Sequence, residues 1–399
     1  MVGRFAMFFF LLLAGSRLSA QDSVWLGRTT GKMPYMEYGI GDDRLGGAKM
    51  GLLDSNVLVK VVDSFHTEYK IQLSQNHSAY MAKANVLLVS KQADVFQPHN
   101  AHLSGHMKVY GDTAYDYVDI GLDERLPYHI VQSIEPSRVI LDLFGVTSNT
   151  NWIMQMKTAK EIRNTWYEQV EDDVFRVTIE LKHQQHWGFS PGYDSAGKKL
   201  VIRIRRQPAI ADIRKLRIAI DAGHGGDNIG ASGNAVGNLS PVLEKDYTLM
   251  IAKELQKTLK RAGVRQVFMT RLKDTSLSMP ERVAMLKQFS PDLLVSVHLN
   301  SATSDTVRGV STYYRYIGFR PLSEAIMQQM LTLGLKEYGN VGNFNFALSG
   351  PTDYPNALVE VAFLSNPADE KKIVSPKFQR AVAQKIYLGI QDWLKQLKP

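Results

Sequence analysis

The chain has 399 residues, 44% hydrophobic and 22% charged, a balance that fits two or three globular domains and excludes collagen-like, disordered and multi-span membrane classes. Its formal net charge of +8 favours an anionic partner. Because it contains no cysteine, disulfides, zinc fingers, iron–sulfur clusters and thiol nucleophiles are excluded, and a metal ion would need His and carboxylate ligands.

Residues 1–20 have the pattern of a secretory signal. Arg4 precedes an apolar run from Phe5 to Ala14, and small residues end the segment at 18–20. The run is too short for a membrane anchor, so we expect export to the periplasm or cell envelope, with no stable membrane insertion after signal removal. Removal leaves a net charge of +6 on 379 residues. Because these charges are scattered, a cell-surface polymer or acidic peptide is favoured over nucleic acid.

Residues 21–95 alternate between apolar and polar side chains over short segments. The clearest strand candidates lie at 57–62, 69–73, 79–81 and 86–89. Short strands separated by polar turns predict a small β-barrel. The segment Tyr69–Ser74, followed by Ala79-Tyr80, resembles a bacterial SH3-like module, so we expect an SH3-like domain here.

Residues 96–208 form a second β-rich stretch with no segment of convincing helical period. Strand candidates lie at 108–110, 117–120, 139–144, 175–181 and 200–204. The order of these strands, with Pro136–Leu143 near the middle, resembles the AMIN-type β-sandwich often attached to envelope enzymes. We therefore expect a β-sandwich as the second domain.

Residues 211–399 change to strands that alternate with amphipathic helices, which predicts an α/β domain with a mostly parallel sheet. We expect strands at 216–221, 266–270, 293–298, 309–316 and 357–363. Three helices are expected: one that begins after Glu244, one from Pro321 to about Glu337, and one that begins at Ser375-Pro376. The chain is thus expected to be multidomain, with two β-rich modules ahead of an α/β domain.

The first predicted strand of this domain runs into a glycine-rich loop at residues 222–230. Ligands of open α/β sheets bind at the carboxyl ends of strands. The dinucleotide fingerprint is not met, because Asn228 stands in place of a glycine and a long loop precedes the next helix. The ten histidines of the chain include only two in this domain, His224 and His298, and both follow predicted strands. Each could be a hydrogen-bonded structural residue, but together at one sheet edge they could also bind a metal.

Two glutamates add to this pattern. Glu244 extends the apolar stripe of its helix, so it should face inward, either as a carboxylate favoured by the helix dipole or as a metal ligand. Glu360 interrupts the apolar strand 357–363. It could pair with a surface Lys or Arg, but desolvation raises the pKa of a buried carboxylate, which suits a proton shuttle near neutrality.

Two His and one Glu would leave one tetrahedral position open for water, as catalytic zinc sites require. Zinc lowers the pKa of that water to about 7, and Glu360 could take its proton and pass it to a departing amine. This chemistry is metal-assisted amide hydrolysis. The four residues form no local motif, so their spacing alone is a weak signal.

Residues 217–395 resemble the zinc-dependent N-acetylmuramoyl-L-alanine amidases of the amidase-3 family. The matching segments are Ile220–Gly226, Glu244-Lys245, Thr270-Arg271, Ser296–Asn300 and Leu358–Asn366. The resemblance implies that His224, Glu244 and His298 bind one Zn²⁺ and that Glu360 is the catalytic base. It also implies peptidoglycan as the substrate, cut at the amide between the N-acetylmuramic acid lactyl group and L-alanine of the stem peptide.

The sequence departs from the family pattern in three places. Asn228-Ile229 replace the usual Asp-Pro and Val361-Ala362 replace the usual Cys-Gly, which we expect to affect loop shape rather than chemistry. Only Ser301–Arg308 follows the second His strand, where some members carry a long helical insertion that blocks the site. We therefore expect an open site that needs no activator, while envelope proteins remain possible partners.

Other readings stay open at this point. The enzyme could be another zinc amidohydrolase or carboxypeptidase acting on wall peptides, or a wall-binding protein without activity. The clusters His99, His102, His106 and His183, His186 lie beside Pro and Gly and are not expected to bind metal. Arg271 and Asn300 are expected to brace loops, and the sequence identifies no substrate-binding residue.

Overall fold

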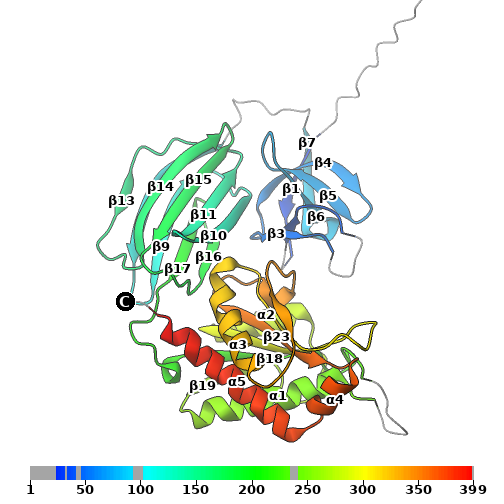
Figure 1. The fold of residues 1–399 in the computed structure, drawn as a ribbon. Helices are drawn as coiled ribbons and strands as arrows, with labels where there is room; N and C mark the ends of the chain where they lie inside the picture. The colour runs from blue at the N-terminus through cyan, green and yellow to red at the C-terminus, as the bar shows by residue number, and fades with distance from the viewer. Residues whose placement is uncertain (1–23, 32–33, 42–45, 93–101, 234–240, 398–399) are drawn as a thin grey trace, which may run out of the picture.

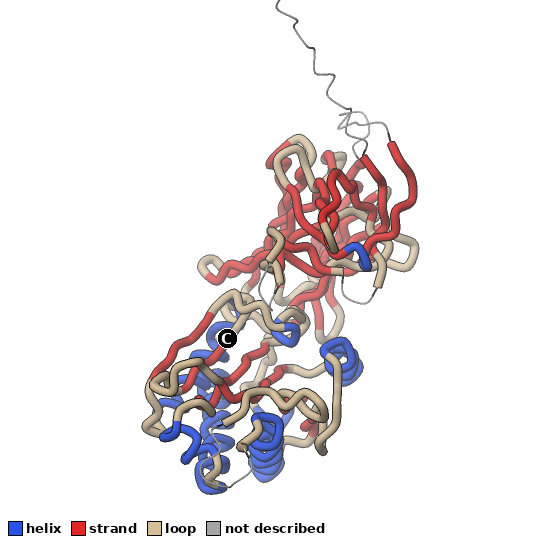
Figure 2. Tube along the Cα trace, turned by 90° about the vertical axis from the view of Figure 1, so that its right-hand side faces the viewer, coloured by secondary structure: helices blue, strands red, loops and turns tan. Residues whose placement is uncertain are grey.

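The computed structural model describes residues 24–31, 34–41, 46–92, 102–233 and 241–397. The expected signal at residues 1–20 lies outside these ranges. Figure 1 shows three parts: a small β-rich part, a larger one with two sheets, and a C-terminal part in which helices and strands mix. The tube in Figure 2 places the helices of the chain almost entirely in this last part. The protein is therefore multidomain, with a β-rich N-terminal region and an α/β C-terminal domain.

The first part is a seven-stranded sheet in which every neighbouring pair is antiparallel, in the order β3-β2-β6-β5-β4-β1-β7. Alternation of apolar and polar residues places one face of β4 and β5 in the core. The strands are β1 (Val24–Thr29), β2 (Tyr35–Glu37), β3 (Lys49–Leu52), β4 (Leu58–Phe65), β5 (Glu68–Gln72), β6 (Ser78–Ala82) and β7 (Val86–Gln92).

The second part has two sheets. One has the order β10-β11-β15-β14, and the other has the order β12-β8-β9-β17-β16, with β13 paired to β8. The buried side chains of both sheets join those of the first part in one continuous cluster. The strands are β8 (His102–Gly111), β9 (Tyr115–Leu122), β10 (Tyr128–Ile134), β11 (Ser137–Phe144), β12 (Val146–Thr147), β13 (Ile153–Gln155), β14 (Ile162–Glu171), β15 (Val174–Leu181), β16 (Phe189–Tyr193) and β17 (Lys199–Arg205).

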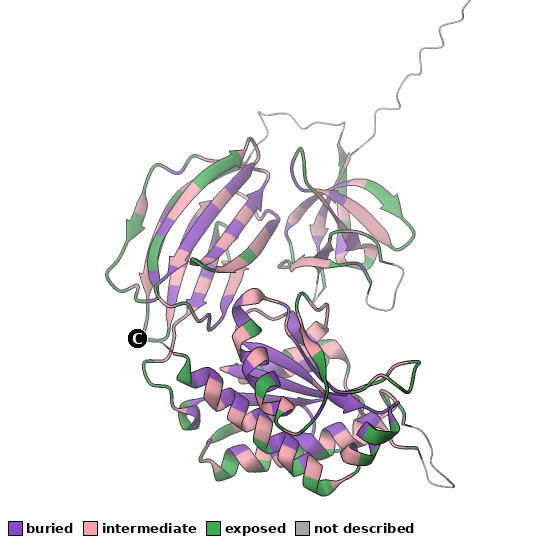
Figure 3. Cartoon of the chain, in the orientation of Figure 1, coloured by how far each residue is buried: buried purple, intermediate pink, exposed green. Residues whose placement is uncertain are grey.

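The C-terminal domain contains a six-stranded sheet of order β19-β18-β20-β23-β21-β22. Four neighbouring pairs are parallel, and β21 runs antiparallel to β23. The central strands are buried on both faces, which explains their nearly continuous apolar sequence (Figure 3). The strands are β18 (Arg217–Ala222), β19 (Gln266–Met269), β20 (Leu293–Asn300), β21 (Val310–Tyr313), β22 (Glu337–Val341) and β23 (Asn356–Phe363).

Helices cover the two faces of this sheet unequally. The large core cluster joins one face to α1, α3 and α5, whereas α2 and a short 3-10 helix, η5 (Ala347–Ser349), cover the other face around a small cluster. The helices are α1 (Glu244–Arg261), α2 (Met279–Phe289), α3 (Arg320–Leu331), α4 (Pro367–Ile373) and α5 (Pro376–Lys395). Among the described residues, none of the helices has the length and apolarity that a membrane span needs.

The helix expected from Pro321 to about Glu337 is shorter in the structure. It ends at Leu331, and Gly334 then adopts a left-handed conformation with φ of 70°. Glu337–Val341 form the edge strand β22 instead. Helix α2 was not expected, although Ser278 and Glu281 form a capping box at its start.

Side-chain packing crosses the boundary expected near residue 208. Trp187 precedes β16 in the second part, yet its side chain is 2% exposed within the core of the C-terminal domain. Its ring lies 4.7 Å from that of Trp393 on α5, and Gln185 donates a hydrogen bond to the carbonyl oxygen of Trp393. The second part therefore completes the core of the third.

Candidate metal centre

Three of the residues singled out in the sequence meet at the carboxyl ends of β18 and β20. His224 follows β18, Glu244 is the first residue of α1, and His298 lies near the end of β20. One ligand atom from each lies within 4.8 Å of the other two. Glu244 Oε1 is 3.1 Å from His224 Nε2 and 3.1 Å from His298 Nδ1. Glu244 and His298 are buried, whereas His224 is partly exposed.

Glycines make this close approach possible. A Cβ at Gly223 would collide with the ring of His298, and a Cβ at Gly230 would collide with the Glu244 carboxylate. His224 itself has a φ of 60°, in the left-handed region that non-glycine residues rarely adopt. The glycine-rich loop thus lets the backbone fold tightly enough to bring the first His to the other two side chains.

Asn228 orients His224. Its Oδ1 accepts a hydrogen bond of 2.8 Å from His224 Nδ1 and another of 3.3 Å from the backbone N–H of Gly230. Nδ1 therefore carries a proton, and Nε2 is the ring nitrogen that faces Glu244. We expected the Asn228-Ile229 departure to affect only loop shape, and this contact corrects that expectation, because Asn228 sets the tautomer of a candidate ligand.

A buried network of ionic and hydrogen-bonded groups lies next to the three candidate ligands. Asp221, on β18, accepts hydrogen bonds from Arg282 Nη1 (2.6 Å), Thr270 Oγ1 (2.7 Å) and Ser296 Oγ (2.7 Å). Arg282, on α2, is 1% exposed and also donates to the carbonyl oxygens of Ala222 (2.8 Å) and His224 (2.5 Å). The guanidinium of Arg282 therefore connects the loop that carries His224 to the carboxylate of Asp221, which lies next to His298.

The second nitrogen of His298 faces this network. His298 Nε2 is buried without a hydrogen-bond partner among the described residues, and Asp221 Oδ2 lies 4.0 Å away. Burial opposes ionisation of Asp221, but Arg282, His298 and two hydroxyl donors hold the pKa of Asp221 below its ordinary value. A carboxylate behind a ligating imidazole is the usual second partner in metal sites.

The charges within the cluster support one another. Burial opposes ionisation of Glu244, yet hydrogen bonds from His224 and His298 hold the pKa of Glu244 well below its ordinary value. Burial likewise opposes protonation of His298, but Glu244, Glu360 and Asp221 raise the pKa of His298. The carboxylates of Glu244, Glu360 and Asp221 thus favour a positive charge between them.

The donor set fits a divalent cation. Two imidazoles and one carboxylate are common ligands of zinc, and bonds of about 2.0–2.1 Å at tetrahedral angles put ligand atoms about 3.4 Å apart. The observed separations of 3.1 Å are close to that value. Three protein ligands leave room for a fourth, which is typical of catalytic rather than structural sites.

Glu360 lies beside this cluster on the neighbouring strand. In the sheet register, His298 pairs with Glu360, and Glu360 pairs with Ser311 on β21. Because paired residues point to the same face of a sheet, Glu360 and His298 share the face that carries α2. Tyr313 also lies on β21, and Asn300, two residues after His298, donates to its hydroxyl at 3.5 Å. The structure therefore brings together the four predicted site residues.

The described histidines of the two other clusters singled out in the sequence have other partners. His183 contacts Glu161 at 2.7 Å, His186 lies between Gln132 and Ser137, and His102 contacts Asp123 at 3.0 Å. His106 stacks on Trp152 with ring centroids 4.4 Å apart, and His99 lies outside the described residues. Within the described ranges, His224, Glu244 and His298 form the one group with metal-ligand geometry.

Arg271 and Asn300 have the bracing contacts that we expected. Arg271 is buried and donates to the carbonyl oxygens of Ala222 (3.0 Å), Gly223 (2.9 Å) and Lys245 (2.6 Å). Asn300 accepts from the backbone N–H of Ser301 at 2.8 Å and donates to Tyr313 at 3.5 Å. Both side chains therefore hold backbone and neighbouring groups around the centre.

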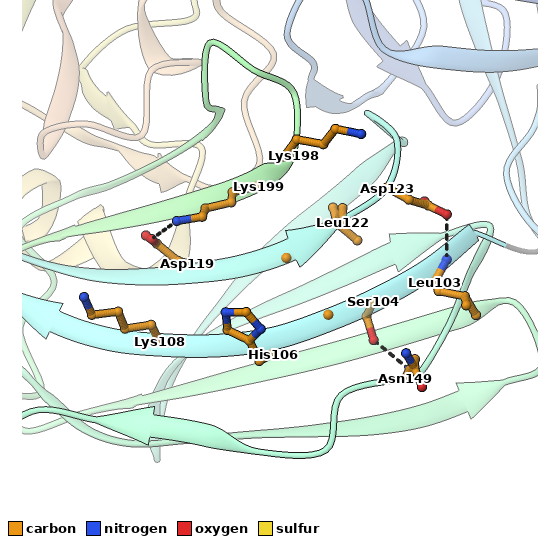
Figure 4. A pocket seen from close by; sticks show the side chains of 12 residues that line it. Leu103, Ser104, His106, Lys108, Asp119, Leu122, Asp123, Asn149, Lys198 and Lys199 are labelled. Atoms are coloured by element: carbon orange, nitrogen blue, oxygen red, sulfur yellow. Dashed lines mark hydrogen bonds and ion pairs between the residues drawn. The ribbon is translucent and has the colours of Figure 1, made fainter.

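A groove lies away from this centre, on the outer face of β8, β9 and β17. Its volume is about 460 Å³, and Figure 4 shows His106 and Lys108 along one strand with Asp119 and Lys199 beside them. Gly105 and Gly121 face each other across two strands of this lining, where neither places a side chain in the groove. Its lining offers three lysines and one imidazole, and it includes none of the residues of the metal cluster.

The C-terminal sequence matches a known family model. Residues 218–392 match the model described as N-acetylmuramoyl-L-alanine amidase. The C-terminal domain belongs to the amidase-3 family. The amidase-3 domain is 33% identical over 174 residues to the probable cell wall amidase LytH of Staphylococcus aureus, which covers 44% of this chain and 57% of that protein. The chain therefore spans little more than half the length of the curated relatives it matches.

Solved structures resemble the same domain. The catalytic domain of CwlV, an N-acetylmuramoyl-L-alanine amidase from Bacillus (Paenibacillus) polymyxa var. colistinus, is 32% identical, with a TM-score of 0.42, and covers 45% of this chain and 97% of that chain. The N-acetylmuramoyl-L-alanine amidase from Clostridium difficile 630 is 32% identical, with a TM-score of 0.42, and covers 45% of this chain and 96% of that chain.

Proposed function

We propose that this chain is a zinc-dependent N-acetylmuramoyl-L-alanine amidase, exported to the periplasm or cell envelope. It hydrolyses the amide bond between the lactyl group of N-acetylmuramic acid and L-alanine of the peptidoglycan stem peptide. The observation that carries this proposal is the convergence of His224, Glu244 and His298 within 4.8 Å, inside an amidase-3 domain. Glu360 stands beside them in the sheet register.

His224, Glu244 and His298 would hold one zinc ion per domain. When bound, zinc supplies Lewis-acid polarisation of the scissile carbonyl and increases the acidity of water in the site. Neighbouring side chains surround the two histidines. Asn228 fixes the tautomer of His224, and Asp221 lies 4.0 Å from His298 Nε2. The hydrogen bond from His224 to Asn228 keeps His224 Nε2 directed at the centre.

Glu360 would be the catalytic base. It takes a proton from the attacking water and later gives it to the nitrogen of L-alanine as the carbon–nitrogen bond breaks, so the proton balance closes without another group. The shared sheet face of Glu360 and His298 supports this role. A positioned acid or base of this kind contributes about 10²–10⁴-fold to the rate.

The site would act without an activator. Only residues 301–309 connect the end of β20 to β21, a connection without helix or strand. The His224 side chain remains 24% exposed, which supports access of substrate from solvent.

The N-terminal parts would serve as wall-binding modules, an SH3-like domain at residues 21–95 and an AMIN-like domain at residues 96–208, ahead of a catalytic domain at residues 211–399. Contacts of these modules with peptidoglycan would raise the effective concentration of the enzyme at its substrate. The sequence match and the curated relatives concern the C-terminal domain, so the role of the modules rests on their position in the chain.

The test is hydrolysis of purified peptidoglycan by the full chain with analysis of newly exposed amino termini. We expect new L-alanine termini, whereas a carboxypeptidase would release other residues and a silent wall-binding protein would release none. Glu360→Ala should lower the rate by at least about 100-fold and leave the zinc content unchanged. His298→Ala should lose the zinc as well.

The matched control is Glu337→Ala, which removes an exposed glutamate from the edge strand β22 and should leave the rate unchanged. Equal rates for wild type and Glu360→Ala would refute the role of Glu360. Full zinc content in His298→Ala would refute the ligand assignment.

A further inference from the structure

The segment between β22 and β23, residues 342–355, lies against the metal cluster. Phe346 in this segment meets the ring of His298 edge to face, with centroids 5.3 Å apart and ring planes at 85°. His298 is only 6% exposed, and Phe346 is one of the side chains that cover it. The position of this segment therefore affects the surroundings of a candidate ligand.

The first N-terminal part holds the segment next to Phe346. Asn345 Nδ2 donates a 3.1 Å hydrogen bond to the carbonyl oxygen of Gly47. Arg315 bridges the two parts, because it donates to Asn345 Oδ1 at 3.3 Å and to the carbonyl oxygen of Lys49 at 2.8 Å. Arg315 is 8% exposed, so water competes weakly for these bonds. The residue adjacent to Phe346 is thus fixed to the start of β3.

The second N-terminal part holds the other end of the same segment. The backbone N–H of Phe189 on β16 donates to the carbonyl oxygen of Thr352 at 2.8 Å. Arg203 on β17 pairs with Asp353 at 3.1 Å. The two backbones approach so closely at Gly188 that a Cβ there would collide with the carbonyl group of Asp353. Both β-rich parts therefore contact the segment that carries Phe346, one on each side.

We propose that the two N-terminal parts are positioning elements of the metal centre, and that Phe346 is the positioning residue through which they act. Fixing the segment at both ends holds Phe346 on His298, excludes water from that ring and keeps Nδ1 directed at Glu244. Groups around metal ligands commonly change metal affinity by about 10–100-fold. The part of this inference that concerns metal affinity rests on the proposed function, whereas the part that concerns His298 does not.

The first test uses the metal-free full chain and follows the Cε1 proton of His298 by NMR after selective labelling. The ring current of Phe346 shifts this resonance, and Phe346→Leu gives its position without the ring. Arg315→Met removes the bridge to Lys49 but keeps the bulk of the side chain. We expect it to move the resonance toward the Phe346→Leu position, and Asn345→Ala, which breaks the same bridge from the other side, to move it likewise.

The matched control is Arg320→Met, because Arg320 pairs only with Glu324 on the exposed surface of α3 in the contacts described. It should leave the resonance in place. If Arg315→Met and Asn345→Ala keep the wild-type resonance while Phe346→Leu moves it, the proposed link between the first part and His298 is wrong.

The second test measures zinc affinity of the same variants by competition with a chelator. Phe346→Leu should bind zinc at least about tenfold more weakly, Arg315→Met should weaken binding in the same direction, and Arg320→Met should match wild type. Unchanged affinity in the first two variants overturns the positioning role, even where the resonance moves. A wild-type chain that binds no zinc would refute the proposed function, and the resonance would still decide whether the N-terminal parts position Phe346.

Discussion

Replacing Trp187 by alanine should destabilise the C-terminal domain, although Trp187 precedes that domain in the sequence. The side chain is 2% exposed and packs in the core formed by the main sheet and α5. Truncation of a buried Trp to Ala costs about 3–5 kcal/mol. The indole Nε1 of Trp187 is buried without a hydrogen-bond partner among the described residues. Because removing that donor also removes its desolvation cost, the expected loss of stability is about 3 kcal/mol.

Trp187→Phe separates these two contributions. The smaller ring leaves a cavity of roughly 40 Å³, which costs about 1 kcal/mol at about 24 cal/mol per Å³. Loss of the unpaired N–H gives back about 1 kcal/mol or more. The two effects nearly cancel, so the phenylalanine variant should be as stable as wild type within about 1 kcal/mol, and it keeps the aromatic contact with Trp393.

The assay is amide hydrogen exchange in α5, whose Trp393 stacks on Trp187 at 4.7 Å. A loss of about 3 kcal/mol corresponds to roughly 10²-fold faster exchange in α5, because each 1.4 kcal/mol is a factor of ten. Trp152→Ala is the control, since Trp152 lies in the same two-sheet part, is 49% exposed and should leave α5 unchanged. Exchange in α5 that is equal in Trp187→Ala and wild type would refute the shared core.

Two further predictions concern buried ionisable groups. Asp221→Asn leaves Arg282 buried without its carboxylate, so the free energy of unfolding should fall by about 3–5 kcal/mol, and zinc affinity should fall about 10–100-fold; an unfolding curve like that of wild type would contradict the first. Burial lowers the pKa of His186 to about 4, below the value of about 6.5 in an unfolded chain. Between about pH 6.5 and pH 4 the unfolded chain binds a proton at His186 that the folded chain does not. The free energy of unfolding therefore falls by about 3 kcal/mol as the pH drops through this range, and His186 causes no loss above about pH 6.5. Urea unfolding of His186→Gln should lose this pH dependence, while His66→Gln, an exposed control, should keep it.

The positions of five strands of the C-terminal domain and the meeting of the site residues follow from local signals in the sequence. His224 and His298 could be paired before the fold was known because each follows an apolar strand. Glu360 could be singled out because a charge in a doubly covered strand has no packing explanation. These features depend only on short segments and on the rule that parallel strands end at one edge of the sheet.

Helix α2 and strand β22 lack the apolar patterns that predict the other elements. The buried side chains of α2 are Arg282 and Leu286, so its inner face is partly charged and shows no apolar period. Strand β22 lies at the edge of the sheet, where one side has no neighbour and exposed polar residues are tolerated. The capping box at Ser278 and Glu281 was the available signal for α2.

Contacts between segments that lie far apart in the chain also could not be predicted from local sequence patterns. Asn228 affects the tautomer of His224 only because the loop folds back on itself. Phe346 and Trp187 are ordinary aromatic residues in the sequence, and their roles depend on partners that lie 48 and 206 residues away. Contacts over such separations depend on the whole fold, so a local sequence pattern does not indicate them.

The two faces of the C-terminal sheet explain why the N-terminal parts matter to the site. Three long helices complete one face, whereas the face that carries Asp221, His298 and Glu360 has only α2, η5 and a small apolar cluster. The segment that closes this thinner face contacts both N-terminal parts. Since no helical insertion follows β20, the surroundings of the candidate metal centre depend on how the β-rich parts pack. An isolated C-terminal domain would lose Trp187 from its core and the contacts that hold Phe346, so the proposed activity should be measured on the full chain.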